Sequence, residues 1–285
     1  MSVRLAMWSG PRNISTAMMR AWENRADTTV WDEPLYAHYL KTTGLIHPGG
    51  DTIIADGLTN WHDVATRATG PIPNDAPVFY QKHMTHHLLP EIPRDWLTNL
   101  THVFLIRDPR EVLLSYTRSR ETVTLEDIGF TQQTALFDWL TQQQGQAPLV
   151  IDSGDFLRAP RVYLEKLCDH VGIQFSDTML TWPPGPRDSD GVWAPHWYAS
   201  VENSTHFAPW HERPGTLSGE LAGIEAAARP HYEKLAAIRW RPCKPGSRPS
   251  LRSPPPTGTP YFGTADRRGH AVTLSTLGGF QIPEC

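Results

Sequence analysis

Short apolar runs that alternate with helix-like segments are the feature of this sequence that most restricts its fold. Each run is partly β-branched, as buried strands are, and each is followed by a segment that favours a helix. The predicted strands are residues 3–8, 28–31, 78–80, 102–106 and 149–151, and the predicted helices are residues 15–24, 85–89, 109–117, 125–143 and 160–171. This alternation predicts an α/β fold in which a parallel sheet is flanked by helices.

The length and composition of the chain predict one main domain and a tail. A chain of 285 residues that is 39% hydrophobic can bury one sizeable core. From residue 240 the sequence becomes dense in Pro, Ser, Gly, Arg and Lys, and so polar a segment cannot offset the entropy lost on ordering. We therefore expect a single domain over residues 1–239 and a flexible, disordered tail over residues 240–285. Residues 183–214, rich in Pro, Trp and His, are expected to form an irregular loop that could cover a site.

Net charge and cysteine content exclude several classes of protein. A net charge of −4 lacks the basic surface that neutralises a nucleic-acid backbone, so no nucleic-acid partner is expected. Three widely spaced cysteines form neither a disulfide framework nor a paired zinc motif. The first apolar stretch, residues 5–8, is too short for a signal peptide, and no segment is long enough to cross a bilayer. These observations favour a cytoplasmic protein without a membrane partner.

A candidate phosphate-binding loop follows the first predicted strand. Backbone amides at a helix N-terminus, together with the positive end of the helix dipole, bind phosphate without help from net charge. Gly10 allows the chain to turn and Arg12 adds a fixed positive charge. The candidate loop consists of Ser9, Gly10, Pro11, Arg12, Asn13, Ile14, Ser15 and Thr16. A simpler interpretation is a strand-to-helix turn in which Ser15 is an ordinary N-cap.

The loop differs from the Walker loop of nucleotide hydrolases. The Walker pattern requires Gly and Lys before the hydroxyl residue, whereas Asn13 and Ile14 precede Ser15 here. Without that lysine, and without an obvious magnesium-binding acid, hydrolysis of ATP or GTP is not expected.

A second candidate element follows the fourth predicted strand. Arg107 comes directly after residues 102–106, at the carboxyl end of a strand, where open α/β sheets bind ligands. Asp108 and Pro109 suit the N-cap and the first position of a helix. Ser115 lies six residues after Pro109, about 9 Å along that helix. A guanidinium and a hydroxyl at this separation could hold a second phosphate of one nucleotide.

Together these two elements resemble the P-loop sulfotransferase family. Its members carry a loop like S-x-P-[RK]-S-G-[ST]-T after the first strand and an R-[DN]-P-x-x-x-x-x-S element after a later one. The likeness extends over about residues 3–173, with Asn13 and Ile14 in place of the Ser and Gly of the family's loop. The matching residues are Ser9, Pro11, Arg12, Ser15 and Thr16 in the first pattern and Arg107, Asp108, Pro109 and Ser115 in the second.

The resemblance implies a P-loop NTPase-like fold and a nucleotide sulfate donor, 3′-phosphoadenosine 5′-phosphosulfate (PAPS). The 5′-phosphosulfate would bind the first loop, and the 3′-phosphate would lie near Arg107 and Ser115. The family needs no metal, so side-chain cations must stabilise the charge that develops during transfer. The acceptor partner would carry a hydroxyl or an amine.

Arg12 and Lys82 are the candidate cations, and Glu33 and His83 are the candidate general bases. Lys82 and Glu33 follow the third and second predicted strands and should lie at the carboxyl edge of the sheet. A histidine titrates nearer neutrality, yet the position of Glu33 favours it slightly over His83. A metal site formed by His83 and the histidines at 86 and 87 is disfavoured, because no carboxylate or cysteine pattern accompanies them.

Two other functions remain open at this stage. An ATP-dependent small-molecule kinase would share the fold and the first loop, and would require Mg²⁺. A non-catalytic, sulfotransferase-like nucleotide-binding protein is favoured by the Asn13–Ile14 departure from the family's loop.

Overall fold

The computed structural model describes residues 2–116 and 122–242, and within them five parallel strands form one sheet. The strands lie in the order β2-β3-β1-β4-β5, and their bounds are β1 (Val3–Ser9), β2 (Thr28–Asp32), β3 (Val78–Met84), β4 (Thr101–Ile106) and β5 (Leu149–Asp152). The predicted α/β fold with a parallel sheet is confirmed. The central strand β1 pairs with β3 on one side and with β4 on the other. The loops that follow β1 and β4 therefore lie next to each other at the carboxyl edge.

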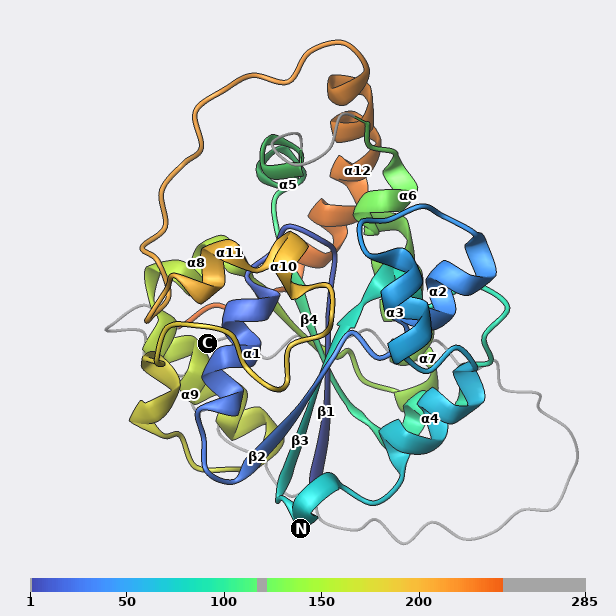
Figure 1. The fold of residues 1–285 in the computed structure, drawn as a ribbon. Coiled ribbons are helices and arrows are strands. Elements are labelled where there is room, and N and C mark those ends of the chain that lie inside the picture. The colour runs from blue at the N-terminus through green and yellow to red at the C-terminus, as the bar shows by residue number, and fades with distance from the viewer. Residues whose placement is uncertain (1, 117–121, 243–285) are drawn as a thin grey trace, which may run out of the picture. The chain divides into compact units, whose positions relative to one another are not determined.

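Helices cover both faces of this sheet (Figure 1). One face carries α1 (Ser15–Glu23), α8 (Ser153–Arg158) and α9 (Pro160–Val171), and the other carries α2 (Tyr36–Thr43), α3 (Gly50–Asp56), α4 (Trp61–Thr69) and α7 (Phe130–Gln144). Above the carboxyl ends of the strands stand α5 (Pro109–Tyr116), α6 (Leu125–Ile128) and much of α12 (Glu220–Ala237). Short elements complete the described chain: η1 (Pro73–Asp75), η2 (Thr85–His87), η3 (Asp95–Asn99), η4 (Asp177–Leu180), α10 (Ala194–Trp197) and α11 (Ala199–Glu202).

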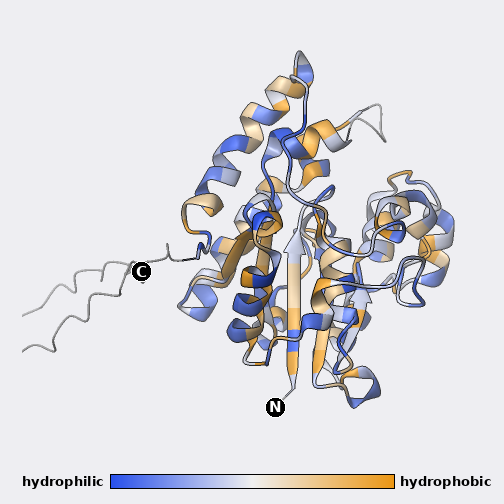
Figure 2. Ribbon diagram, turned by 90° about the vertical axis from the view of Figure 1, so that its left-hand side faces the viewer, coloured by the Kyte–Doolittle hydropathy of each residue, from blue (hydrophilic) through white to orange (hydrophobic). Residues whose placement is uncertain are grey.

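The hydrophobic core follows from the two-residue period of the strands. Leu5 and Met7 of β1 pack with α1 and α9 on one face, whereas Ala6 and Trp8 pack with α7 on the other. Strands buried on both faces read as continuous apolar runs, which is why the sequence revealed them. Figure 2 shows these apolar segments in the central strands, with mixed apolar and polar residues on the helices around them.

Several element boundaries were predicted correctly, and others were not. Helix α9 begins at Pro160 and ends before Gly172, which has the left-handed φ of +76° that suits a helix stop. The predicted helix over residues 85–89 is instead one 3₁₀ turn, η2. The predicted helix over residues 125–143 is divided at Gly129, whose φ of +71° separates α6 from α7. Strand β3 continues past Tyr80 to Met84 because Gln81, Lys82 and His83 are buried with it.

The predicted irregular loop, residues 183–214, is called the strap below. It contains only two short helices, α10 and α11, and is otherwise irregular, as expected. The compact unit of the chain extends to Trp240, whose ring packs against Tyr163 at 4.9 Å. Apart from residues 240–242, the predicted tail lies outside the described residues. In the described ranges, no helix has the length and apolar character needed to span a bilayer.

Candidate active site

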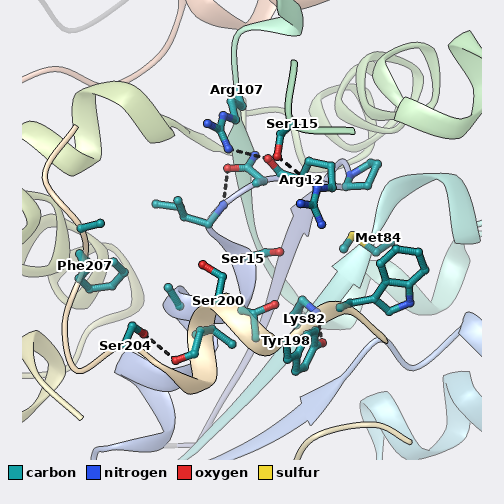
Figure 3. Close-up of a pocket in the computed structure, with 18 of the residues that line it drawn as sticks. Arg12, Ser15, Lys82, Met84, Arg107, Ser115, Tyr198, Ser200, Ser204 and Phe207 are labelled. Carbon is teal, nitrogen blue, oxygen red and sulfur yellow. Dashed lines mark hydrogen bonds between the residues drawn. The ribbon is translucent and has the colours of Figure 1, made fainter. Parts of the chain in front are cut away.

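A cavity of about 410 Å³ opens at the carboxyl edge of the sheet (Figure 3). Its walls include both elements that the sequence singled out, although they lie almost a hundred residues apart in the chain. In Figure 3, Arg107, Ser115 and Arg12 lie together in one part of the cavity, and Lys82 and Tyr198 lie together in another. The predicted site residues that line the cavity are Pro11, Arg12, Asn13, Ser15, Thr16, Glu33, Lys82, Arg107 and Ser115.

Asn13 and Ile14, the two departures from the family's loop, anchor the loop to the core. The Asn13 side-chain amide donates to the Leu105 carbonyl at 3.0 Å, and its oxygen accepts from the Ile14 amide at 2.8 Å. The side chain of Ile14 packs against the core on the α1 face. The loop therefore has a defined shape without the glycine found in the family's pattern.

The N-terminus of α1 faces the cavity. Ser15, Thr16 and Ala17 form its first turn and all line the cavity. Ser15 is the first helical residue, so it is not the N-cap, and among the described residues no side chain caps this turn. The first-turn amides and the positive end of the helix dipole are thus directed at the space that an anion would occupy.

Ser9 and Gly10 support the loop but do not line the cavity. Ser9 is fully buried, with its hydroxyl 3.7 Å from the Met84 sulfur. A Cβ atom at Gly10 would lie 2.6 Å from the Ile128 carbonyl oxygen, closer than any real contact allows. Gly10 is therefore needed for the close approach of α6, rather than for contact with a ligand.

Arg12, Arg107 and Ser115 are directly connected. Arg107 Nη1 donates to the Arg12 carbonyl at 2.6 Å, and Arg12 Nε donates to Ser115 Oγ at 3.2 Å. Burial, followed by the proximity of Arg213, lowers the pKa of the Arg107 guanidinium from its ordinary value. An anion bound beside Arg107 would offset both effects, because it supplies the opposite charge.

Glu111, which sequence reasoning did not identify, lies among three of the arginines. Its carboxylate is 3.5 Å from Arg107, 3.2 Å from Arg110 and 3.4 Å from Arg213. The exposed Glu212 lies 4.0 Å from Arg110, so two carboxylates face three guanidinium groups and an excess of positive charge remains at this end of the cavity. Arg213 comes from the end of the strap and also lines the cavity.

Lys82 is at the centre of a buried polar cluster in the other part of the cavity. Its ammonium group donates to Asp32 Oδ1 at 2.8 Å, to Glu33 Oε1 at 2.7 Å and to the Tyr198 hydroxyl at 2.6 Å. These three bonds use all three of its protons. The Tyr198 hydroxyl in turn donates to Asp32 Oδ2 at 2.5 Å, so the cluster ties the strap to the ends of β2 and β3.

Glu33 is held in an unusual backbone conformation. Its φ is +36°, in the left-handed region that non-glycine residues rarely adopt, and Arg12 in the first loop has a φ of +55°. Strained residues of this kind cluster at functional sites. Burial raises the pKa of the Glu33 carboxyl above its ordinary value, and the Lys82 ammonium offsets only part of that rise.

His83, the alternative candidate base, does not line the cavity. It lies on the opposite side of β3 from Lys82, where its ring stacks on Trp8 with centroids 4.4 Å apart. Burial lowers the pKa of His83 to about 3. The structure therefore places His83 away from the cavity, because consecutive strand residues point to opposite faces.

The structure adds residues that the sequence did not assign to the site. Asp32 and Tyr198 complete the Lys82 cluster, and His87 lines the cavity near Glu33. Asp32 could have been found from its position at the end of a predicted strand. Tyr198 had no such signal, because it lies 116 residues from Lys82 in an irregular segment. Across residues 2–116 and 122–242, no group of His, Cys, Asp or Glu side chains is arranged to hold a metal ion.

Comparison with known proteins identifies the family. A family model described as "Sulfotransferase domain" matches residues 3–238, and the chain belongs to this family. Two solved structures share the fold: the sulfotransferase domain from the curacin biosynthetic pathway and the sulfotransferase from Alicyclobacillus acidocaldarius. The first has a TM-score of 0.52 and 16% identity, covering 80% of this chain and 98% of that one. The second has a TM-score of 0.51 and 11% identity, covering 84% and 96%.

Two curated relatives from Arabidopsis thaliana are more similar in sequence. Branched-chain-amino-acid aminotransferase-like protein 1 is 36% identical over 210 residues, and protein 2 is 32% identical over 214 residues. Each match covers 74% of this chain but only 37% of the relative. This chain therefore spans little more than a third of the length of each protein that carries one of these names.

Proposed function

We propose that this protein transfers a sulfuryl group from PAPS to a hydroxyl or amine of an acceptor, without a metal ion. The observation that carries the proposal is that the first loop and the Arg107–Ser115 element line one cavity and touch each other. Arg12 Nε lies 3.2 Å from Ser115 Oγ, so one doubly phosphorylated nucleotide can reach both elements. Membership of the sulfotransferase domain family supports the same donor.

The donor would bind through the groups already described. The first-turn amides of α1, with the side chains of Arg12, Ser15 and Thr16, would hold the 5′-phosphosulfate. Arg107 and Ser115 would hold the 3′-phosphate, with Arg213 as a third partner. The positive charge that Glu111 leaves unneutralised favours a 3′-phosphate dianion over a plain 3′-hydroxyl at this position.

In the transfer step, the acceptor oxygen or nitrogen forms a bond to sulfur as the bond from sulfur to the bridging phosphate oxygen breaks. Negative charge develops on that leaving oxygen, and Arg12 is placed to stabilise it. The acceptor proton passes to Glu33, the candidate base that lines the cavity. A carboxyl whose pKa is raised toward the working pH is a more effective base.

Lys82 contributes mainly through Glu33. Because its three protons are bound by Asp32, Glu33 and Tyr198, it fixes the carboxylate of Glu33 and keeps a positive charge near the reacting sulfur. Lys82 is therefore proposed as a residue that positions Glu33, rather than as a direct ligand of the sulfuryl group.

The test is a transfer assay with ³⁵S-labelled PAPS and a heat-inactivated cell extract, whose own transferases and kinases are no longer active, in the presence of EDTA. We expect labelled products with EDTA present, and none when the nucleotide is ATP with Mg²⁺ and a ³²P label. Phosphoryl transfer from ATP would favour a kinase. Tight binding of the product 3′,5′-bisphosphate (PAP) with no transfer to any acceptor would indicate a non-catalytic binding protein.

A further inference from the structure

His87 presents a buried polar atom beside the free oxygen of Glu33. Within the described residues, His87 Nδ1 is buried without a hydrogen-bond partner, and the side chain is only 3% exposed. An unsatisfied buried polar atom is costly and calls for a missing partner. This atom lies 3.9 Å from Glu33 Oε2, too far for a direct hydrogen bond.

The other oxygen of Glu33 is already occupied. Lys82 donates to Oε1 at 2.7 Å, which leaves Oε2 directed toward His87. A single oxygen atom can lie about 2.8 Å from both Oε2 and Nδ1, since the two atoms are 3.9 Å apart. The arrangement therefore matches one hydroxyl that donates to Glu33 and accepts from His87. Both residues line the cavity.

The plane of the His87 ring is fixed by aromatic neighbours. Tyr36 stacks on it with centroids 4.5 Å apart and planes 9° apart, and Tyr39 stacks on it at 4.7 Å. Burial, followed by the proximity of His86, lowers the pKa of His87 well below its ordinary value. The ring is therefore a neutral, preorganised hydrogen-bonding group near the candidate base.

The walls around this pair are aromatic. Tyr36, His47 and Trp197 line the cavity, and the Tyr36 hydroxyl lies 2.8 Å from His47 Nδ1. Among the described lining residues, the arginines belong to other parts of the cavity: the first loop, the end of β4 and the end of the strap. In this part, Lys82 is already paired with Glu33. An anionic substituent on the acceptor would meet these rings and a Lys82 whose protons are already bound, and it would be desolvated at a high cost.

We propose that Glu33 Oε2 and His87 Nδ1 together bind the acceptor hydroxyl, and that the acceptor is an aromatic hydroxyl compound without an anionic substituent. The inference rests on the proposed function and extends it to the acceptor class. His87 carries its proton on Nδ1 and donates it to the acceptor oxygen, while the acceptor proton points at Glu33. As the oxygen bonds to sulfur, its proton moves to Oε2 and PAP leaves with the electron pair of the broken bond.

An aromatic hydroxyl also suits the strength of the base. A phenolic hydroxyl has a pKa near 10. This value is much closer to the pKa of a carboxyl group than the pKa of an aliphatic alcohol is. Proton transfer to Glu33 is therefore less unfavourable for a phenol. Aromatic acceptors can in addition stack on the rings of the cavity wall.

The test uses equilibrium binding of three matched compounds to the PAP-loaded protein. The probes are 2-naphthol, its carboxylated analogue 6-hydroxy-2-naphthoate, and 2-decalol, which has the same skeleton without aromaticity. We expect 2-naphthol to bind at least about tenfold more tightly than either of the others. Equal or tighter binding of the carboxylate or of 2-decalol, or no binding of 2-naphthol, would overturn the proposal.

Two variants separate the hydrogen bond from general packing. His87→Leu should weaken 2-naphthol binding about tenfold, the loss expected when one buried partner is removed. His87→Asn keeps a donor at the position of Nδ1 and should retain most of the affinity. Both variants should bind PAP as the wild type does, which shows that they are folded. Unchanged 2-naphthol affinity in His87→Leu contradicts the role of His87.

The proposed function is tested separately by the same titrations. If the wild-type protein does not bind PAP, the sulfotransferase proposal fails, whereas 2-naphthol binding to the protein alone still reports on the acceptor subsite. If PAP binds and the naphthol series behaves otherwise than expected, only the acceptor inference fails.

Discussion

Among individual residues, we expect the side chains in this cavity to contribute to nucleotide binding and transfer through their charge and their hydrogen-bond partners. Arg107 is the clearest case on the donor side. It is largely buried, close to other arginines and bonded to the first loop through the Arg12 carbonyl. A bound phosphate would relieve the repulsion, so the affinity for a nucleotide should depend strongly on this residue.

Arg107→Ala should weaken PAP binding by about 2 kcal/mol, or about 30-fold, because a desolvated charge pair is lost. The PAP affinity of Arg107→Lys should fall between those of the wild type and Arg107→Ala, since a lysine keeps the charge but not the paired donors. Isothermal calorimetry measures both. Wild-type affinity in Arg107→Ala would remove the assignment of this residue to the nucleotide.

The pH dependence of turnover should identify the base. Glu33 must be ionised to accept a proton, so the rate should rise with pH through its pKa. Because burial raises that pKa, the rise should occur above the range of an ordinary glutamate. Glu33→Gln should lower kcat by about 100-fold or more and abolish the rise.

His83 provides the matched control for this experiment. His83→Asn should lower Tm, because it removes a ring that stacks on Trp8, but the pH profile of kcat should keep its acidic limb. A profile that loses this limb in His83→Asn and keeps it in Glu33→Gln would reverse the assignment.

At the scale of the element, the strap is attached to the sheet by buried charge. Arg20 of α1 forms two hydrogen bonds with Asp190, both at 2.6 Å, and its side chain is 1% exposed. The Tyr198 hydroxyl joins the same segment to Asp32 and Lys82. The first half of the strap is therefore a fixed wall of the site rather than a separate lid.

Asp190→Ala should destabilise the fold by about 3 kcal/mol, because it leaves the buried Arg20 guanidinium with only the more distant Glu23 carboxylate, at 3.5 Å. The double variant Arg20→Met with Asp190→Leu should recover much of this loss, since neither charge is then buried. Urea denaturation measures both. Equal destabilisation by the single and double variants would show that packing, not charge, attaches the strap.

At the scale of the whole molecule, the compact unit extends one residue beyond the domain boundary expected from composition. Trp240 donates its amide to the Val150 carbonyl at 2.9 Å and packs its ring on Tyr163. We propose that residues 1–242 fold and bind nucleotide independently of the remaining sequence, whose composition cannot support a core.

A chain that ends at Pro242 should therefore keep the Tm and PAP affinity of the full chain. A chain that ends at Arg239 should be less stable by about 1 kcal/mol, because the aromatic contact of Trp240 is lost. Differential scanning calorimetry of the three lengths tests this. A lower PAP affinity in the chain ending at Pro242 would assign a function to the remaining residues.

The parallel α/β fold and the two candidate phosphate elements could be predicted from the sequence alone. Doubly buried strands are apolar throughout, and a loop that joins a strand to a helix keeps its motif in consecutive residues. For the same reason Arg12, Ser15, Arg107 and Ser115 could be identified before any coordinates were known. Their proximity also followed from topology, once β4 is known to pair with β1.

Which polar residues meet in the second part of the cavity depends on how distant elements pack. The polar end of β3 did not look like a strand, so the sequence analysis placed both Lys82 and His83 among the candidate site residues. Consecutive residues of a strand face opposite sides, and of these two only Lys82 lines the cavity. The partners of Lys82 and His87 come from β2, α2 and the strap, far away in the sequence. Contacts of this kind depend on how the elements pack, and packing leaves no local pattern in the chain.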